Sequence, residues 1–230
     1  MNYPPLSKLI SFEGKFVAVT GACSEIGRRT AMRFAESGAR VILLDADAEG
    51  LAELVDAVTA QGYRAHSHEM DISDPEQIRE VVDHISREHG HLAVWCTIAS
   101  IFPCAPTLEM DPDSFQRMID LNLKATFFSG QQAARSMIEA GTEGTIINVI
   151  APAQRKPMSR KDPYLSTKGA VHGFTRALAG ELADRNIRVL AIDPSLAMQA
   201  DADEVARVIF FSASGMLPIM SGSSLRAQAV

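Results

Sequence analysis

The sequence predicts an α/β fold in which helices cover both faces of one doubly wound parallel sheet. Short apolar runs recur along the chain, segments with helical periodicity separate them, and no composition break or internal linker interrupts the alternation. Apolar runs of this length are typical of parallel strands that are buried on both faces. We therefore expect residues 1–230 to form a single domain.

Local signals give the order of the elements. The apolar runs lie at 16–19, 41–44, 92–96, 145–149 and 188–192, and a further run at 64–70 is third in order. Helices are expected to begin at Asp74-Pro75 and Asp111-Pro112, where an aspartate N-cap precedes a proline at the first helical position. Two long helices with apolar faces are expected over 111–140 and 162–185.

Composition and charge exclude several classes of protein. The chain has 47% hydrophobic residues, a net charge of −6 and no long basic block, so we expect no nucleic-acid partner. No stretch reaches the roughly 18 apolar residues of a membrane span. The three cysteines cannot all pair with one another and lack metal-ligand spacing, which suits a reducing compartment. The prediction is a cytoplasmic protein without a membrane partner.

Two pairs of histidines have a spacing that metal sites sometimes use. They are His66 with His68 and His89 with His91. Each pair lies near a strand end or a loop among polar residues, where solvated or hydrogen-bonded histidines are the common case. We therefore predict no metal site from these pairs.

The segment "TGACSEIG", residues 20–27, predicts a phosphate-binding turn. Gly21 and Gly27 bracket the turn, and its backbone amides and the positive end of the following helix attract anions. Asp45 ends the second strand, where it can accept hydrogen bonds from an adenosine ribose and repels a 2′-phosphate, which indicates NAD rather than NADP. Asp71 is placed to reach the adenine edge. Glu25 opposes a pyrophosphate, so either its carboxylate points away or the site has lost its ligand.

The segment "YLSTK" places Tyr164 and Lys168 four residues apart, on one face of a helix. An ammonium beside a phenol lowers the pKa of the phenol and poises it as a general acid/base. The same spacing also arises on helices where both residues only pack. Here the pair follows the fifth strand, at the sheet edge where ligands bind in this fold, and this position favours the catalytic interpretation.

Several motifs in order resemble those of the short-chain dehydrogenase/reductase family across nearly the whole chain. They are "TGACSEIG", Asp45 and Asp71, "DLNLKATF", "GTIINV", "YLSTK" and "NIRVLAIDP". The resemblance implies a Rossmann-like fold and a nicotinamide-dependent alcohol oxidation or carbonyl reduction. It implies that Tyr164 is the acid/base, that Lys168 lowers the pKa of the tyrosine and holds the nicotinamide ribose, and that Asn122 supports a proton-relay water.

The chain departs from this family pattern at the catalytic serine, which Ala151 replaces. An alanine cannot stabilise developing oxyanion charge, and the loss of one such donor costs roughly 10²–10³ in rate. Ser159 lies nearer the tyrosine in sequence, but nothing in the sequence aims it at the site. The resemblance also implies that cofactor packing is weakened and that the substrate lid near 195–203 is shortened. The residues that carry these further departures are Glu25, Thr97, Ile98, Ser100 and Ser195.

A degenerate member that keeps its oligomerisation helices resembles the non-catalytic partner of an active subunit. We therefore expect a pseudoenzyme subunit of an NAD-dependent heterotetramer, similar to the inactive subunits of heteromeric dehydrogenases in anaerobic toluene degradation. In such a complex NAD is bound by the catalytic partner rather than firmly by this chain. Two alternatives stay open. One is an active NAD-dependent oxidoreductase in which Ser159 or a main-chain group replaces the missing donor, and the other is a non-enzymatic module that binds another ligand or a protein.

Overall fold

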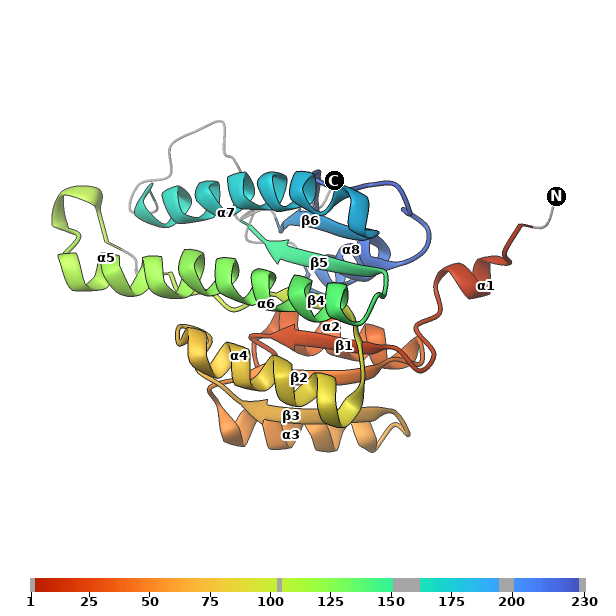
Figure 1. Cartoon of the computed structure of the whole chain (residues 1–230). Helices are drawn as coiled ribbons and strands as arrows, with labels where there is room; N and C mark the ends of the chain where they lie inside the picture. Colours follow the sequence, from red (N-terminus) through yellow and green to blue (C-terminus); the bar gives the residue numbers. More distant parts are fainter. Residues whose placement is uncertain (1–2, 103–104, 151–161, 195–200, 228–230) are drawn as a thin grey trace.

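The computed structural model describes residues 3–102, 105–150, 162–194 and 201–227. Within these residues the strands form one parallel sheet of seven strands in the order β3-β2-β1-β4-β5-β6-β7 (Figure 1). The strands are β1 (Phe16–Thr20), β2 (Arg40–Asp45), β3 (Arg64–Glu69), β4 (Leu92–Thr97), β5 (Gly144–Val149), β6 (Ile187–Asp193) and β7 (Ser224–Arg226). The predicted α/β fold with a doubly wound parallel sheet is confirmed.

The α-helices of the described residues alternate with the strands. They are α1 (Leu6–Leu9), α2 (Glu25–Glu36), α3 (Ala48–Thr59), α4 (Pro75–His84), α5 (Pro112–Ile119), α6 (Ala125–Glu139), α7 (Asp162–Glu181) and α8 (Ala202–Ala213). The predicted starts of α4 and α5 are confirmed, since the Asp74 side chain accepts a hydrogen bond from the Glu76 amide and Asp111 accepts one from the Ser114 amide. Both prolines occupy the first helical position.

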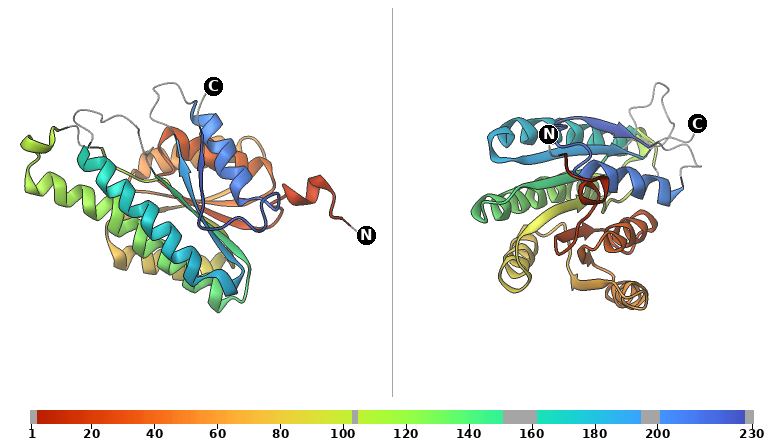
Figure 2. Two further views of the ribbon diagram at one scale, coloured as in Figure 1. Left: turned by 90° about the horizontal axis from the view of Figure 1, so that it is seen from above. Right: turned by 90° about the vertical axis from the view of Figure 1, so that its right-hand side faces the viewer.

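Helices cover both faces of the sheet (Figures 1 and 2). The hydrophobic core on one face contains side chains of α2, α3 and α8, and the core on the other face contains side chains of α4, α6 and α7. Strand β1 shows the division, because Val17 and Val19 belong to the first core and Phe16 and Ala18 to the second. This alternation follows from the two-residue period of a strand, and both faces of β1 are buried.

Two π-helices interrupt the helical segments. Ile85–His89 continues α4, and Asp120–Lys124 joins α5 to α6, so the helix expected over 111–140 is three elements in succession. Together α5, Asp120–Lys124 and α6 extend beyond the ends of the strands (Figure 1). A π-turn adds one residue to a helical turn, and such turns are frequent at functional sites. None of the helices that the structure describes is long and apolar enough to span a bilayer.

Candidate functional site

The candidate site lies at the carboxyl ends of the central strands of the sheet. Thr20, the last residue of β1, is in register with Leu44 of β2 and with Thr97 of β4. Chain connections diverge here, because β2 and β4 lie on opposite sides of β1. Ligands of doubly wound sheets bind at such a switch point, beyond the carboxyl ends of the strands. The structure therefore brings the turn after β1, the end of β2 and the turn after β4 to one place.

The turn after β1 depends on two glycines. Gly21 has φ +65°, and a Cβ atom there would lie 2.6 Å from the amide nitrogen of Ala99 in the turn after β4. At Gly27 a Cβ atom would overlap the carbonyl oxygen of Gly21. Both glycines are thus required by close backbone approach, which is also what lets a turn of this kind approach a phosphate.

Glu25 occupies the first position of α2. Ser24 is the N-cap, and its hydroxyl accepts a hydrogen bond from the Gly27 amide at 3.1 Å. The Glu25 side chain is exposed. A carboxylate in the first turn interacts favourably with the positive end of the helix dipole, so Glu25 stabilises α2. The Glu25 carboxylate therefore puts a negative charge at the helix end where a pyrophosphate would bind, and the two would repel each other.

The Asp45 carboxylate braces the turn after β1. It accepts hydrogen bonds from the Cys23 amide at 2.9 Å and from the Asp47 amide at 3.2 Å, one on each oxygen. Each oxygen keeps a further lone pair, so these bonds leave Asp45 able to accept from a ribose. Asp71 lies two residues beyond β3 and is exposed, and its Oδ1 accepts bonds from the amide and the hydroxyl of Ser73.

Tyr164 and Lys168 lie side by side on α7, as their spacing predicts. The Lys168 ammonium is 5.8 Å from the centre of the Tyr164 ring and donates a hydrogen bond to the carbonyl oxygen of Val149 at 3.0 Å. Lys168 is only 3% exposed, and burial lowers its pKa from 10.5 to about 8. A low-dielectric environment penalises the charged form, and this is why the pKa of Lys168 falls.

The pKa of Tyr164 depends on burial and on one neighbouring side chain. Burial raises this pKa, and the Ser100 side chain lowers it. The lowering of this pKa by Lys168 stays a prediction, and the Lys168 ammonium itself is buried and bonded to Val149 O. The sequence did not indicate that Ser100 acts on Tyr164, because the two residues lie far apart in the chain.

Asn122 ties the turn after β4 to α7. It is fully buried in the π-helix Asp120–Lys124. Its Oδ1 accepts a hydrogen bond from the Ile101 amide, and its Nδ2 donates to the Ile101 carbonyl oxygen, both at 2.9 Å. Nδ2 also lies 3.3 Å from the hydroxyl of Thr167, which in turn donates to the carbonyl oxygen of Tyr164. Asn122 thus holds the segment that carries Ser100 against the helix that carries Tyr164.

The other residues of the turn after β4 face the core. Thr97 is buried, and its hydroxyl accepts a hydrogen bond from the indole nitrogen of Trp95. The Ile98 side chain is 5% exposed, and its amide donates to the hydroxyl of Thr20. Thr97 and Ile98, which depart from the family pattern, therefore contribute to packing and hydrogen bonding in the core. Ala151, Ser159, Ser195 and most of the expected lid near 195–203 lie outside the described residues, and of that lid only residues 201–203 are described, at the start of α8.

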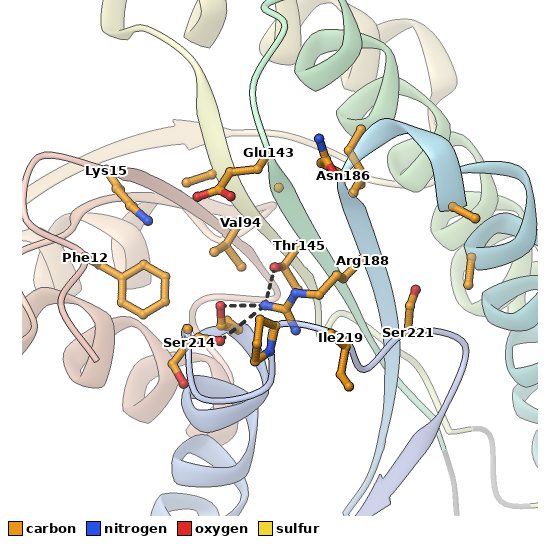
Figure 3. Close-up of a pocket in the computed structure, with 18 residues that line it drawn as sticks. Phe12, Lys15, Val94, Glu143, Thr145, Asn186, Arg188, Ser214, Ile219 and Ser221 are labelled. Atoms are coloured by element: carbon orange, nitrogen blue, oxygen red, sulfur yellow. Dashed lines mark hydrogen bonds between the residues drawn. The ribbon is translucent and has the colours of Figure 1, made fainter. Parts of the chain in front are cut away.

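A separate cavity of about 420 Å³ lies at the opposite end of the strands, near the start of β5 and β6 (Figure 3). Arg188 lies in its wall and donates hydrogen bonds to the Thr145 hydroxyl and to the carbonyl oxygens of Ser212, Ala213, Ser214 and Leu217. Four of these acceptors are main-chain oxygens at and beyond the end of α8. The guanidinium therefore fastens α8 and the following segment to β5 and β6, which is a structural role.

The residues at the candidate site fit one part of a nicotinamide dinucleotide. Asp45 at the end of β2 and the glycine turn after β1 suit the adenosine end. The exposed carboxylate of Glu25 does not suit a pyrophosphate at the same helix end. Ser100, in the turn after β4, has an exposed side chain that lowers the pKa of Tyr164. The fit is thus confined to the adenosine end.

Comparisons with known proteins agree with this architecture. A family model described as short chain dehydrogenase matches residues 15–206. The 3-oxoacyl-[acyl-carrier-protein] reductase FabG of Thermotoga maritima is 34% identical over 182 residues, which cover 79% of this chain and 74% of the relative.

Solved structures give the same result. A short-chain type dehydrogenase/reductase from Mycobacterium marinum is 28% identical, with a TM-score of 0.92 and 97% of each chain covered. An NAD⁺-bound xylitol dehydrogenase is 27% identical, with a TM-score of 0.87 over 94% of this chain and 98% of the other. The similarity extends over almost the whole of each of these chains.

Proposed function

We take as a premise that this chain belongs to the short-chain dehydrogenase/reductase family, and we propose that it is a non-catalytic subunit of an NAD-dependent oxidoreductase complex. In this proposal the chain stabilises or regulates a catalytic subunit of the same family in a cytoplasmic heterotetramer. Its relatives are named as reductases and dehydrogenases, so the proposal concerns what this chain has lost relative to them. In this proposal residues 1–230 form one domain.

The observation that carries the proposal is the burial of Tyr164, which raises the pKa of its hydroxyl. A tyrosine that acts as general base needs a lowered pKa and a hydroxyl that is open to the substrate oxygen. Here burial has the opposite effect on the pKa of Tyr164. The sequence adds Ala151 where the family resemblance implies the substrate-binding serine. Both changes remove transition-state stabilisation.

Glu25 supports the same proposal from the cofactor side. Its exposed carboxylate lies in the first turn of α2 and opposes a pyrophosphate. The chain would therefore bind NAD weakly, and the NAD of the complex would be held by the catalytic partner. Asp45, Asp71, Gly21 and Gly27 are in this proposal remnants of an ancestral cofactor site, as Tyr164, Lys168 and Asn122 are of the catalytic site.

Exposed aromatic side chains support the proposal that the chain has a partner subunit. Phe115 on α5 and Phe127 on α6 are both 41% exposed, and Phe127 packs on Phe174 of α7 with ring centres 4.9 Å apart. Family members commonly assemble through the helices that correspond to these. The pattern of losses resembles the inactive subunit of the dehydrogenase that oxidises 2-[hydroxy(phenyl)methyl]succinyl-CoA in anaerobic toluene degradation, and we extend the proposal to aromatic-compound degradation of that kind.

A second candidate function rests on the effect of Ser100 on Tyr164. The Ser100 side chain lowers the pKa of the Tyr164 hydroxyl, so it could take the place of the missing serine as donor to a substrate oxygen. The chain would then be an active NAD-dependent oxidoreductase with rearranged catalytic residues. Asn122, Tyr164 and Lys168 are present for it. A third candidate, a non-enzymatic binding module, has no structural observation in its favour.

Titration of the purified full chain with NAD and NADH tests the proposal. We expect no saturable heat up to about 1 mM cofactor. The variant Glu25→Gly should then gain measurable binding, because it removes the carboxylate from the helix end. Glu49→Gly is the matched control, since Glu49 is likewise exposed in the first turn of a helix, α3. Saturable micromolar binding by the unaltered chain would sink the proposal and favour the active oxidoreductase.

Isolation of the chain from its native cells tests the partner. We expect it to copurify in fixed stoichiometry with a second subunit of the family, and we expect NAD-dependent alcohol oxidation from the complex and none from this chain alone. Turnover by the isolated chain that is lost in Tyr164→Phe would establish the second candidate instead. A chain that purifies without a dehydrogenase partner and without turnover would favour the binding module.

A further inference from the structure

Four histidines gather on one face of the edge strand β3. His66 and His68 come from β3, His84 ends α4, and His89 ends the π-helix Ile85–His89. The ring centres of His66 and His89 are 4.4 Å apart, and those of His68 and His84 are 4.9 Å apart. The sequence analysis expected solvated or hydrogen-bonded histidines in two pairs. The structure packs residues of both pairs together and adds His84, which belonged to neither pair.

The local backbone explains why these rings meet. His66 and His68 are two residues apart in a strand, so both point to the face that α4 covers. His84 and His89 are five residues apart, which on a regular α-helix would place them about 140° from each other. The π-helix changes this, because its bonds join residues five apart, as in the bond from the Gly90 amide to the Ile85 carbonyl oxygen at 3.0 Å. His84 and His89 thus face β3 together.

We propose that His68, His84 and His89 bind a divalent transition-metal ion of the zinc class. One ring nitrogen from each of these residues lies within 4.8 Å of the other two. Ring nitrogens on a tetrahedral zinc ion lie about 2.0–2.1 Å from the metal and hence roughly 3.4 Å from one another. Small rotations of three side chains that are only partly buried close that difference.

The distances between ring centres agree with this geometry. On a tetrahedral ion they would be roughly 5 Å. The observed values are 4.9 Å for His68 and His84, 5.9 Å for His84 and His89, and 6.0 Å for His68 and His89. The set is therefore already close to the arrangement that three imidazoles adopt around one ion, and the fourth position is left for water or for His66.

An unsatisfied nitrogen is a second observation that points to a ligand. The Nε2 atom of His68 is buried and has no hydrogen-bond partner among the residues that the structure describes. Buried polar atoms almost always have a partner, so an orphaned imidazole nitrogen requires an explanation.

The chemistry of the donors selects the metal. The group consists of imidazoles alone, which suit zinc, nickel and copper, whereas magnesium and calcium need oxygen ligands. The cluster also lies apart from the candidate site. The ring centres of His89 and Phe16 are 5.9 Å apart, and Phe16 begins β1, whereas the glycine turn follows the end of β1. The proposed ion would therefore fasten the edge strand β3 to α4, independently of the proposed function.

Titration of Zn²⁺ into the full chain, purified without a polyhistidine tag and freed of metal by a chelator, tests the proposal. We expect one equivalent to bind with a Kd in the micromolar range or below, and we expect the midpoint of thermal unfolding to rise. The variants His84→Gln and His89→Gln should each weaken binding by more than about 100-fold, which exceeds the usual effect of losing an outer-shell partner. His91→Gln is the matched control, because His91 is exposed and outside the cluster.

Three results would overturn the proposal. One is the absence of binding by the unaltered chain up to about 100 µM Zn²⁺. Another is unchanged affinity in both His84→Gln and His89→Gln, and the third is an equal loss of affinity in His91→Gln. Thermal unfolding without metal shows that each variant is folded. If His84→Gln fails that check, His89→Gln and His66→Gln decide the question, with a large loss expected for the first and a smaller one for the second.

Discussion

Ser100 acts on the phenol of Tyr164 and lowers its pKa, although one residue follows strand β4 and the other lies at the start of α7. Burial has the larger effect and raises this pKa. Asn122 keeps the two segments together through its pair of bonds to Ile101. The state of the phenol is therefore decided by the turn after β4 and by burial.

Replacement of Ser100 should change the titration of Tyr164. In Ser100→Ala the side-chain effect that lowers the pKa of Tyr164 is gone while burial stays, so we expect this pKa to rise further. Absorbance titration of tyrosinate measures this change. The same titration of Tyr164→Phe identifies the contribution of Tyr164 among the tyrosines. A Tyr164 pKa that is unchanged or falls in Ser100→Ala would show that Ser100 does not act on the phenol.

Lys168 should make the stability of the chain rise with pH. Its pKa is about 8 in the native state against 10.5 for the free group, so between these values the unfolded state binds more protons and the free energy of unfolding increases with pH. The interval corresponds to about 3 kcal/mol at about 1.4 kcal/mol per pH unit. Below about pH 8 this gain is absent.

Denaturant unfolding of the unaltered chain and of Lys168→Met at about pH 7 and about pH 10 measures that gain. We expect the unaltered chain to become more stable relative to the variant as the pH rises, because methionine carries no titratable group. Parallel pH profiles of the two proteins would contradict the lowered pKa of Lys168.

Gly21 and Gly141 offer a matched pair for the turn after β1. Their φ angles are +65° and +63°, so an alanine has the same backbone strain at both, about 1–2 kcal/mol. A Cβ atom at Gly141 meets nothing within 4 Å, whereas at Gly21 it would crowd Ala99. We therefore expect Gly21→Ala to lower the free energy of unfolding by at least about 3 kcal/mol and Gly141→Ala by less than about 2. Equal losses would show that the turn can yield at Ala99.

Asp45 should contribute to stability even without a ligand. Asp45→Ala leaves the amides of Cys23 and Asp47 without their acceptor, and hydrogen bonds to a charged group are worth about 1.5–3 kcal/mol each. We expect a loss of about 3 kcal/mol in urea unfolding. Asp71→Ala is the control, because Asp71 is exposed and its carboxylate accepts bonds from Ser73 in the same turn, so a loss of at most about 1 kcal/mol is expected. An equal effect of both variants would refute the bracing role.

The architecture could be predicted because its signals are local. The apolar runs became β1, β2, β4, β5 and β6, and the aspartate–proline pairs at 74–75 and 111–112 start α4 and α5. Strand β7 was missed, because it has three residues and its sequence carries no strand pattern. The two π-helices of the described residues were missed as well, because a π-turn is defined by its backbone hydrogen bonds and not by a residue pattern.

The candidate site was predictable only in part. The sequence indicated that Tyr164 and Lys168 share a helix face, and the structure agrees. It gave no sign that Ser100 would reach the tyrosine, nor that Asp45 would brace Cys23, because each contact joins segments that lie far apart in the chain. Side-chain partners of this kind depend on how the turns after β1 and β4 are stacked, which no local pattern encodes.

The sequence by itself determined the alternation of strands and helices, the parallel sheet and the residues that line its carboxyl edge, because periodicity and capping act within a few neighbouring residues. Only the tertiary structure decided which groups meet. It let Ser100 act on Tyr164, and it brought His68 to His84 and His89. The physical reason is that charge, burial and coordination are properties of neighbours in space, and those neighbours are chosen by the packing of helices on the sheet.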